Sequence, residues 1–339
     1  MARLRSRRLA IAVLKTVVAV VVLSAVVRHV IRTYGDLRGR SESIHFEPLW
    51  LVISGLLYLA GLLACAVYYE RILRSSNAPV SLIAAWRAYI VSHLGKYVPG
   101  KAMVVVLRSG MTVRYGGRAS TSAIATFYET LVMMCAGCLV AAVGFAGGSR
   151  SDTIEFTLWN WGRVELPVYR IAAFSGLGLA LAFLIMVLPP VFRRVANFIA
   201  LPIPGVEIDA FPRITAGLLM RGLFWSSGGW ILLGLSQLAV IRSFDPVGAD
   251  SVFALGLAPV VIASVALATV AGFVVAVLPG GLGVREGVLM SALAPALGKD
   301  HAVVAALSLR LVWVAAELVA AAIFFPWLER RSAATGLAP

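Results

Sequence analysis

An unusual number of charged side chains lie close to two proline–glycine breaks within apolar segments. The first break holds Pro99 and Gly100, and it is surrounded by Lys96, Tyr97, Lys101 and, further on, Arg108. Proline removes a backbone donor and clashes with the preceding helical turn, and glycine permits backbone conformations that end a helix. In lipid, backbone groups freed in this way need protein or water as partners. The break therefore predicts an interrupted helix that lines a binding site.

The second break has the same character and carries more glycine. Its helix-breaking residues are Pro279, Gly280, Gly281 and Gly283, and Arg285 and Glu286 follow directly. A short helix that begins at Arg285 presents the positive end of its dipole, which favours an anion. The glycines resemble a nucleotide-binding loop, but no strand precedes them, so dinucleotide binding is not expected.

Three further charged residues lie inside long apolar runs. Glu129 is about ten residues into one run, and Arg310 and Glu317 share the last one. A charge at the bilayer centre costs about 2.5–3.5 kcal/mol on insertion scales, so such residues mark functional sites by default. Two helical turns separate Arg310 from Glu317, which places them on one face but about 10 Å apart. Each is therefore expected to have another partner.

The charges near the breaks do not balance in the sequence. Five cations, at positions 96, 101, 108, 285 and 310, stand against three carboxylates, at positions 129, 286 and 317. A phosphate-bearing ligand would supply the missing negative charge, because Arg and Lys both bind phosphate oxygens. The alternative is that the charges pair with one another and only lock helices together.

Other reactive residues indicate no further chemistry. His93 at a helix break is more typical of a hydrogen-bonding cap than of a catalyst, and Cys135 and Cys138 lie within an apolar run without a second cysteine pair. No metal-binding or nucleophile motif is present. The sequence therefore predicts neither a metal nor a cofactor, and it does not favour an enzyme.

The composition indicates that the segments carrying these residues lie in lipid rather than in water. Of 339 residues, 60% are hydrophobic and only 14% are charged, and the mean hydropathy is +0.91. Soluble domains have about 45–50% apolar and roughly 25% charged residues. The net charge of +14 lies mostly between the apolar runs, as expected of loops that flank a membrane. Nucleic-acid binding is not expected, because no recognisable module is present.

Apolar runs of about 20 residues predict the membrane spans. Seven are clear: Leu9–Ile31, Pro48–Tyr69, Ala119–Gly147, Pro167–Leu188, Ala216–Ile241, Ser251–Leu278 and Ala302–Trp327. Leu82–Leu107 is interrupted, and Gly287–Leu297 is too short to span. The expected fold class is therefore an all-α polytopic integral membrane protein of about seven or eight transmembrane helices, with two re-entrant or broken helices.

Arginines at the N-terminus predict that it is cytoplasmic by the positive-inside rule, in a multi-pass protein of the cell membrane. The segment Ser149–Glu165 then falls outside, and 191–213 is a polar, proline-rich connection. An N-in, C-in arrangement is preferred if Ser251–Leu278 does not cross simply. The chain is expected to be one transmembrane domain, 1–339, with inverted half-repeats at about 48–147 and 251–328.

The two breaks resemble the signatures of a known family. Pro279-Gly-Gly-Leu-Gly-Val-Arg-Glu286, with Gly298 and Arg310, looks like the second signature of the flippase-like membrane region of lysylphosphatidylglycerol synthases, and Lys96-Tyr-Val-Pro-Gly-Lys101 with Arg108 and Glu129 looks like the first. The resemblance covers roughly residues 10–330. Departures occur at Thr130 and at Ala102-Met103, where the family often has other residues. The chain is expected to be a stand-alone member without the synthase domain, so the resemblance implies lipid translocation and not synthesis.

The resulting hypothesis is flippase-like translocation of a lipid with an anionic, phosphate-bearing headgroup. The resemblance implies aminoacyl-phospholipids or polyprenyl-phosphate lipids as candidates. Lys96, Tyr97, Lys101, Arg108, Arg285 and Arg310 would bind the headgroup, with Glu129, Glu286 and Glu317 orienting those cations. Two alternatives stay open: a membrane-embedded enzyme acting on lipid-linked phosphates or sugars, and a non-transporting scaffold for lipid synthesis. Whether the chain forms a homo-oligomer or binds a lipid-synthesis enzyme is also open.

Overall fold

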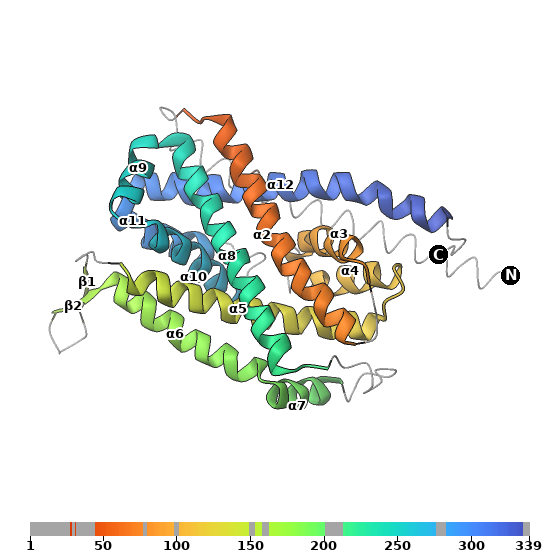
Figure 1. Ribbon diagram of the computed structural model, residues 1–339. Coiled ribbons are helices and arrows are strands. Elements are labelled where there is room, and N and C mark those ends of the chain that lie inside the picture. The colour runs from red at the N-terminus through yellow and green to blue at the C-terminus, as the bar shows by residue number, and fades with distance from the viewer. Residues whose placement is uncertain are drawn as a thin grey trace.

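The protein is a bundle of long apolar helices with two interrupted helical segments between them (Figure 1). The computed structural model describes Arg28, Ile31 and residues 45–76, 80–97, 102–148, 153–157, 163–200, 213–275 and 283–334. The elements are α2 (Pro48–Ser75), α3 (Leu82–His93), the 3₁₀ turn η1 (Leu94–Tyr97), α4 (Ala102–Val113), α5 (Ala119–Ala146), β1 (Thr153–Thr157), β2 (Arg163–Pro167), α6 (Val168–Val187), α7 (Pro189–Ala200), α8 (Ala216–Phe244), α9 (Pro246–Ala254), α10 (Ala258–Val274), α11 (Val284–Leu297) and α12 (Lys299–Ala334).

Local sequence accounts for where several helices begin. The side chains of Ser81 and Thr215 accept hydrogen bonds from the backbone three residues on, at 3.3 and 3.2 Å, and so cap α3 and α8. Asp245 caps α9 in the same way at 2.8 Å. Pro48 stands at the first position of α2, where its missing N–H group leaves no hydrogen bond unmade.

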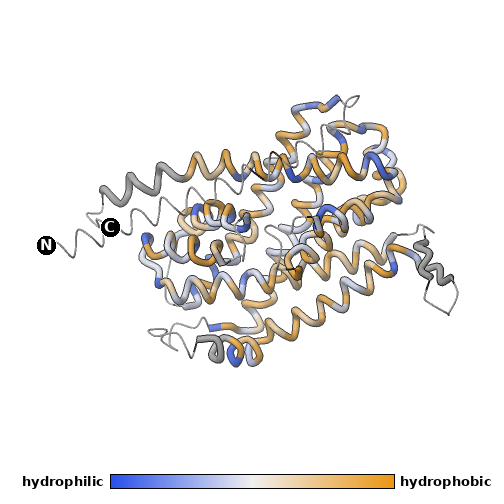
Figure 2. Tube along the Cα trace, turned by 180° about the vertical axis from the view of Figure 1, so that it is seen from behind, coloured by the Kyte–Doolittle hydropathy of each residue, from blue (hydrophilic) through white to orange (hydrophobic). Residues whose placement is uncertain are grey.

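The described residues confirm an all-α polytopic membrane protein. Five helices are long and apolar enough to cross a membrane, namely α2, α5, α6, α8 and α12, and the bent pair α9–α10 brings the count to six. Figure 2 shows long hydrophobic stretches along these helices. The first predicted span, Leu9–Ile31, lies outside the described residues except for Arg28 and Ile31. Which membrane holds the protein, and which side its N-terminus faces, stay predictions.

The predicted span Ser251–Leu278 is not one continuous helix. Helix α9 ends at Ala254, and α10 begins at Ala258 after a bend of 103°. Gly256 at the bend has a φ of +66°, a left-handed conformation that glycine adopts at no steric cost, and Pro259 lies in the first turn of α10. Helix α10 then ends at Val274, so this segment is two short helices rather than one long one.

Two further corrections concern the connections. The segment 149–165 was predicted only as an external loop. Within it, strands β1 and β2 form an antiparallel hairpin in which the backbone of Glu155 lies opposite that of Glu165. The segment 191–213, predicted as a polar connection, instead begins within helix α7, which ends at Ala200. One turn of this helix is anchored because the buried ring of Phe192 packs edge-on against Tyr128 of α5, 4.8 Å between centroids.

Both predicted breaks separate a pair of short helices. Helices α3 and α4 have 12 residues each, which is too short to span a bilayer, and they pack against each other on either side of the first break. Helices α10 and α11, of 17 and 14 residues, pack together around the second break in the same manner. Each pair is followed by a long helix, α5 or α12. We call the two pairs the first and second helical hairpins.

The order of helices in 48–146 therefore parallels that in 216–334. Helices α2 and α8 lie against each other and run in opposite directions. Helices α5 and α12 also run in opposite directions in the view of Figure 1. Helix α5 packs on α10 of the second hairpin, and α12 packs on α3 of the first. The inverted half-repeat, at about 48–147 and 251–328, stays a prediction.

Small residues let the two halves approach closely. A Cβ atom built on Gly144 of α5 would lie 2.5 Å from the carbonyl oxygen of Pro259 and 2.7 Å from Cβ of Ala263, both on α10. Close helix contact through small residues is a main source of stability in membranes. Cys135 and Cys138, on the same helix, are buried and free.

We predict that Gly144→Ala lowers the free energy of unfolding by about 1–3 kcal/mol, because the backbone of α10 must move to admit the methyl group. Thermal unfolding of the purified protein in detergent would measure this. Gly178→Ala on α6 is the matched control, since no atom lies within 4 Å of the added Cβ. Equal midpoints for wild type and Gly144→Ala would contradict the close packing of α5 on α10.

Candidate functional site

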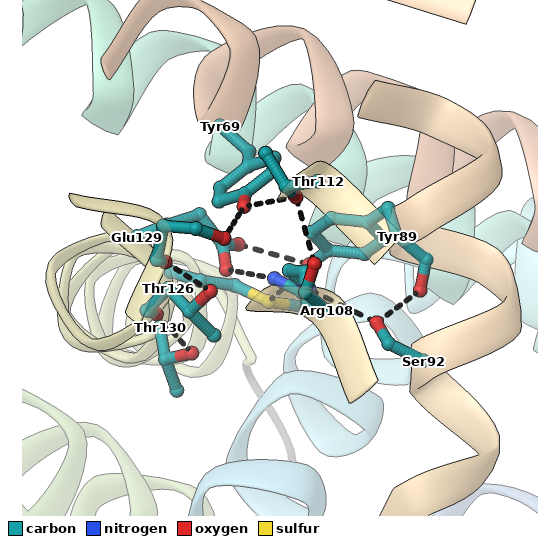
Figure 3. A network of polar contacts seen from close by, with 10 residues as sticks. Tyr69, Tyr89, Ser92, Arg108, Thr112, Thr126, Glu129 and Thr130 are labelled. Atoms are coloured by element: carbon teal, nitrogen blue, oxygen red, sulfur yellow. Dashed lines mark hydrogen bonds and ion pairs between the residues drawn. The ribbon is translucent and has the colours of Figure 1, made fainter. Parts of the chain in front are cut away.

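Among the described residues near the two breaks, charged side chains form three ion pairs, each associated with a helical hairpin. In the first, Arg108 of α4 donates from Nη1 to Oε2 of Glu129 on α5 at 3.1 Å (Figure 3). Arg108 also donates from Nε to the Ser92 hydroxyl at 3.0 Å, and Tyr89 donates to Glu129 Oε1 at 2.9 Å. We call these four residues the Arg108 cluster. It ties together both helices of the first hairpin and the long helix that follows.

Aromatic rings complete the surroundings of Arg108. The centre of its guanidinium group lies 3.8 Å from the ring centroid of Tyr89 and 5.2 Å from that of Tyr69. The Tyr69 hydroxyl in turn bonds to Ser122 at 2.6 Å and to Thr112 at 3.1 Å. Because Arg108 and Glu129 are only 2% and 1% exposed, a ligand could reach them only if the cluster rearranged.

The second ion pair joins the two halves of the chain. Glu317 of α12 is fully buried, and it accepts hydrogen bonds from Lys96 Nζ and from the hydroxyls of Tyr58 and Tyr97, the last at 3.0 Å. His93 Nε2 lies 3.9 Å from the same carboxylate. We call these five residues the Glu317 cluster. Its cation and both hydroxyls come from the N-terminal half, whereas its carboxylate comes from the C-terminal half.

The third ion pair lies at the N-terminal end of α11, the second helix of the second hairpin. Arg310 of α12 pairs with Oε1 of Glu286, and Oε2 of Glu286 accepts a hydrogen bond from the backbone N–H of Gly283 at 2.8 Å. Gly283 has a φ of +80°, in keeping with its predicted role as a helix break. The positive end of α11 was predicted to hold an anion, and Glu286 itself supplies that negative charge.

Arg285 differs from the other described cations of the site. It has no carboxylate within ion-pair distance among the described residues, and its guanidinium centre instead lies 4.2 Å from the ring centroid of Trp313. Trp313 is held from two sides, because it stacks on Tyr58 at 4.3 Å and donates from Nε1 to the Ser236 hydroxyl at 2.9 Å. The aromatic platform beneath Arg285 is therefore rigid.

The described residues contain part of the predicted excess of positive charge. Among the described residues, three of four site cations are neutralised by Glu129, Glu286 and Glu317, which leaves one, Arg285. Arg310 and Glu317 do not pair with each other. This agrees with the separation of about 10 Å that their spacing along the helix predicts. Lys101, Pro99, Gly100, Pro279, Gly280 and Gly281 lie outside the described residues.

These cations share one region rather than separate outer surfaces. Lys96, Arg108 and Arg285 all lie within electrostatic range of His93, and Arg285 and Arg310 both lie within range of Lys96 and Glu317. The region is bounded by the ends of both hairpins and by helices α2 and α12. No group of three or more His, Cys, Asp or Glu residues that could hold a metal ion occurs within the described part of the chain.

Apart from Tyr97, the aromatic residues of the site were not predicted from the sequence. Tyr58, Tyr89 and Trp313 each contact a site charge, yet an aromatic residue in an apolar run is ordinarily part of the core. One signal was available: Arg310, Trp313 and Glu317 are spaced by three and four residues, which places all three on one helical face. Tyr89 and His93 show the same spacing, and their rings stack with centroids 6.0 Å apart.

Comparison of the chain with protein-family models, with curated proteins and with solved structures finds no match. The resemblance of the two breaks to the membrane region of lysylphosphatidylglycerol synthases is therefore carried by the motif residues alone. What the protein does must be inferred from the chemistry of the charged side chains described above.

Proposed function

We propose that this protein moves a lipid with an anionic, phosphate-bearing headgroup across the membrane. The observation that carries the proposal is Arg285, a cation at a helix break that lacks a carboxylate partner among the described residues. A guanidinium group is planar, and its N–H groups can bind two phosphate oxygens at once. A charge without a partner is expensive within a membrane protein, so an anionic ligand is its natural complement.

The neighbours of Arg285 favour a headgroup over a free anion. Lys96 and Arg310 lie within electrostatic range, but each already has a carboxylate partner. One negative charge on a phosphate would therefore match Arg285, the described site cation without a carboxylate partner. Exposed apolar side chains such as Phe174, Phe224 and Ile323 cover the outside of the helices, where acyl chains can remain in lipid while the headgroup enters.

The arrangement of the helices supports movement between the two sides. Two hairpins with interrupted backbones belong to chain segments that run in opposite directions, as judged from α2 and α8. In secondary transporters, such inverted segments place a midplane site that opens alternately to either side. In this proposal the Glu317 cluster is the joint between the halves, and it must loosen when the site opens.

The proposal is tested with the full chain reconstituted in vesicles that contain a trace of fluorescent phosphatidylglycerol. Wild type is expected to expose inner-leaflet probe to a membrane-impermeant quencher faster than protein-free vesicles do. Arg285→Ala removes charge-assisted hydrogen bonds of about 1.5–3 kcal/mol. It is therefore expected to lower apparent affinity for the probe about 10- to 100-fold. Arg310→Ala, which also leaves Glu286 without its cation, is expected to reduce transport as well.

Two controls sharpen the result. Arg242→Gln removes an arginine that pairs with Asp250 near the end of α8, away from both breaks, and it is expected to keep wild-type transport. Fluorescent phosphatidylcholine, whose headgroup carries no net charge, is expected to move more slowly than phosphatidylglycerol. Unchanged movement of phosphatidylglycerol in both Arg285→Ala and Arg310→Ala would overturn the headgroup role.

A further inference from the structure

Helix α7 lies at one end of the bundle, beyond the end of α6 (Figure 1). Leu188 separates the two helices, because its ψ of 132° lies outside the helical region, and Pro189 begins the next helix. With 12 residues, α7 is too short to cross a bilayer. Its position relative to the membrane must therefore follow from the chemistry of its faces.

The sequence of α7 has one apolar and one polar face. Positions 191, 192, 195, 198 and 199 are apolar, whereas positions 193, 194 and 197 are polar. At 3.6 residues per turn, these two sets lie on different sides of the helix. The bundle covers the apolar face at Phe192, which is 4% exposed, but not at Val195, which is 43% exposed. Arg193 and Arg194 are exposed too, so both faces have residues open to the surroundings.

Other arginines lie at the same end of the bundle as α7. The ring of Tyr68 on α2 leaves no room for a Cβ atom on Gly222 of α8. The Tyr69 hydroxyl bonds to Thr112 of α4 and Ser122 of α5. These contacts place the ends of α2 and α4 beside the starts of α5 and α8, and α7 itself packs on α5. Five exposed arginines at this end have no ion pair among the described residues: Arg114, Arg193, Arg194, Arg213 and Arg221.

The opposite end of the bundle carries charges of both signs. There the N–H group of Glu47 donates to the carbonyl of Ser243 at 2.7 Å, which joins the start of α2 to the end of α8. Carboxylates follow at positions 245, 250 and 300, and cations at positions 242 and 299. At the end that holds α7, Glu70 is buried and already pairs with Arg74, so it does not neutralise the five arginines. The positive-inside rule predicts that this basic end faces the cytoplasm.

We infer that α7 lies in the plane of the membrane surface and binds anionic phospholipids of the leaflet on its side, at a site separate from Arg285. The exposed apolar side chain of Val195 contacts the acyl chains in this arrangement, and Arg193 and Arg194 bind headgroup phosphates. The other three arginines of this end add to the attraction. The inference goes beyond lipid movement and does not depend on it.

An anionic leaflet is the partner that satisfies both faces of α7 at once. Its acyl region accepts the apolar face, and its headgroups supply the negative charge that the arginines lack. An acidic protein or a free phosphate ion would neutralise Arg193 and Arg194 but leave Val195 in water. Lipid is therefore favoured by the combination of charge and apolar surface rather than by charge alone.

A spin label at Val195→Cys tests the depth of the helix, with the full chain in nanodiscs that contain phosphatidylglycerol. Cys65, Cys135 and Cys138 are buried, so the label reacts at position 195. Oxygen, which concentrates among acyl chains, is expected to relax this label more than a water-soluble nickel complex does. The order is expected to reverse for a label at Arg193→Cys, on the polar face.

The mobility of the label at position 195 also measures lipid binding, when phosphatidylglycerol is added to the chain in a neutral detergent. A basic residue near an anionic surface contributes about fivefold in affinity, so Arg193→Gln with Arg194→Gln is expected to weaken binding about 25-fold. Arg193→Lys with Arg194→Lys keeps both charges and is expected to retain most of the affinity. Arg170→Gln removes an exposed arginine at the other end of α6 and is expected to have no effect.

Three results would overturn the inference. One is a label at position 195 that meets the nickel complex more readily than oxygen. Another is equal affinity for phosphatidylglycerol and for phosphatidylcholine, whose headgroup carries no net charge. The third is an equal loss of affinity in Arg170→Gln and in the double glutamine variant. Inorganic phosphate is expected to leave the label unchanged, and a response to it equal to that of the lipid would show an ion site instead.

Discussion

Replacement of Arg108 by alanine is expected to lower the free energy of unfolding by about 3–5 kcal/mol, because Glu129 would remain buried without its cation. The Arg108 cluster leaves little room for relief, since both residues are almost fully buried and Tyr89 donates to the same carboxylate. Unfolding of the purified protein in mixed detergent micelles, followed by tryptophan fluorescence, would measure the change.

A double-mutant cycle measures the interaction between Arg108 and Glu129 separately from the effect that each substitution has on its other neighbours. Arg108→Met combined with Glu129→Leu removes both charges and keeps apolar volume, so it is expected to be more stable than Arg108→Ala alone. Simple addition of the two single effects would show that Arg108 and Glu129 do not interact. Transport by the double variant would show that this pair holds the first hairpin in place and does not bind the headgroup.

Trp313→Ala is expected to lower the free energy of unfolding by about 3–5 kcal/mol, the usual range for removal of a large buried aromatic side chain. The indole is 3% exposed, stacks on Tyr58 and donates to Ser236, so its loss leaves a cavity and removes one of the two hydrogen bonds of the Ser236 hydroxyl. Arg285 also loses the surface on which it lies, and transport is therefore expected to fall together with stability.

Trp313→Phe separates these two effects. Phenylalanine keeps an aromatic face for Arg285 and Tyr58 but cannot donate to Ser236, so a smaller loss of about 1–2 kcal/mol is expected. Transport per folded molecule, with the folded fraction measured by size-exclusion chromatography, should be nearly that of wild type. If Trp313→Phe lost transport as completely as Trp313→Ala, the platform role of the ring would be wrong.

Several features of this protein could be read from local sequence because their physics is local. Long apolar runs predict helices in lipid regardless of how they pack, and five such helices occur at the predicted places. The helix breaks were equally predictable, since proline and glycine act on the backbone of their own turn. Gly283, with its positive φ at the start of α11, follows the sequence prediction directly.

The pairing of the charges was not predictable, because it depends on which helices lie side by side. Arg310 and Glu317 share a helix face, yet Arg310 pairs with Glu286 and Glu317 pairs with Lys96, more than two hundred residues away in the chain. The bend between α9 and α10 was missed for a related reason. An apolar run shows how much surface must avoid water but not whether the chain turns within it.

The amino-acid sequence by itself determined that this chain lies in a membrane, where its helices break and which residues bring charge to those breaks, since composition, backbone geometry and the cost of burying a charge need no knowledge of neighbours. Only the tertiary structure decided that three of the described cations are neutralised and that Arg285 rests on Trp313. Charges interact across space, and the distances between them are set by the packing of α2, α8 and α12 with the two hairpins.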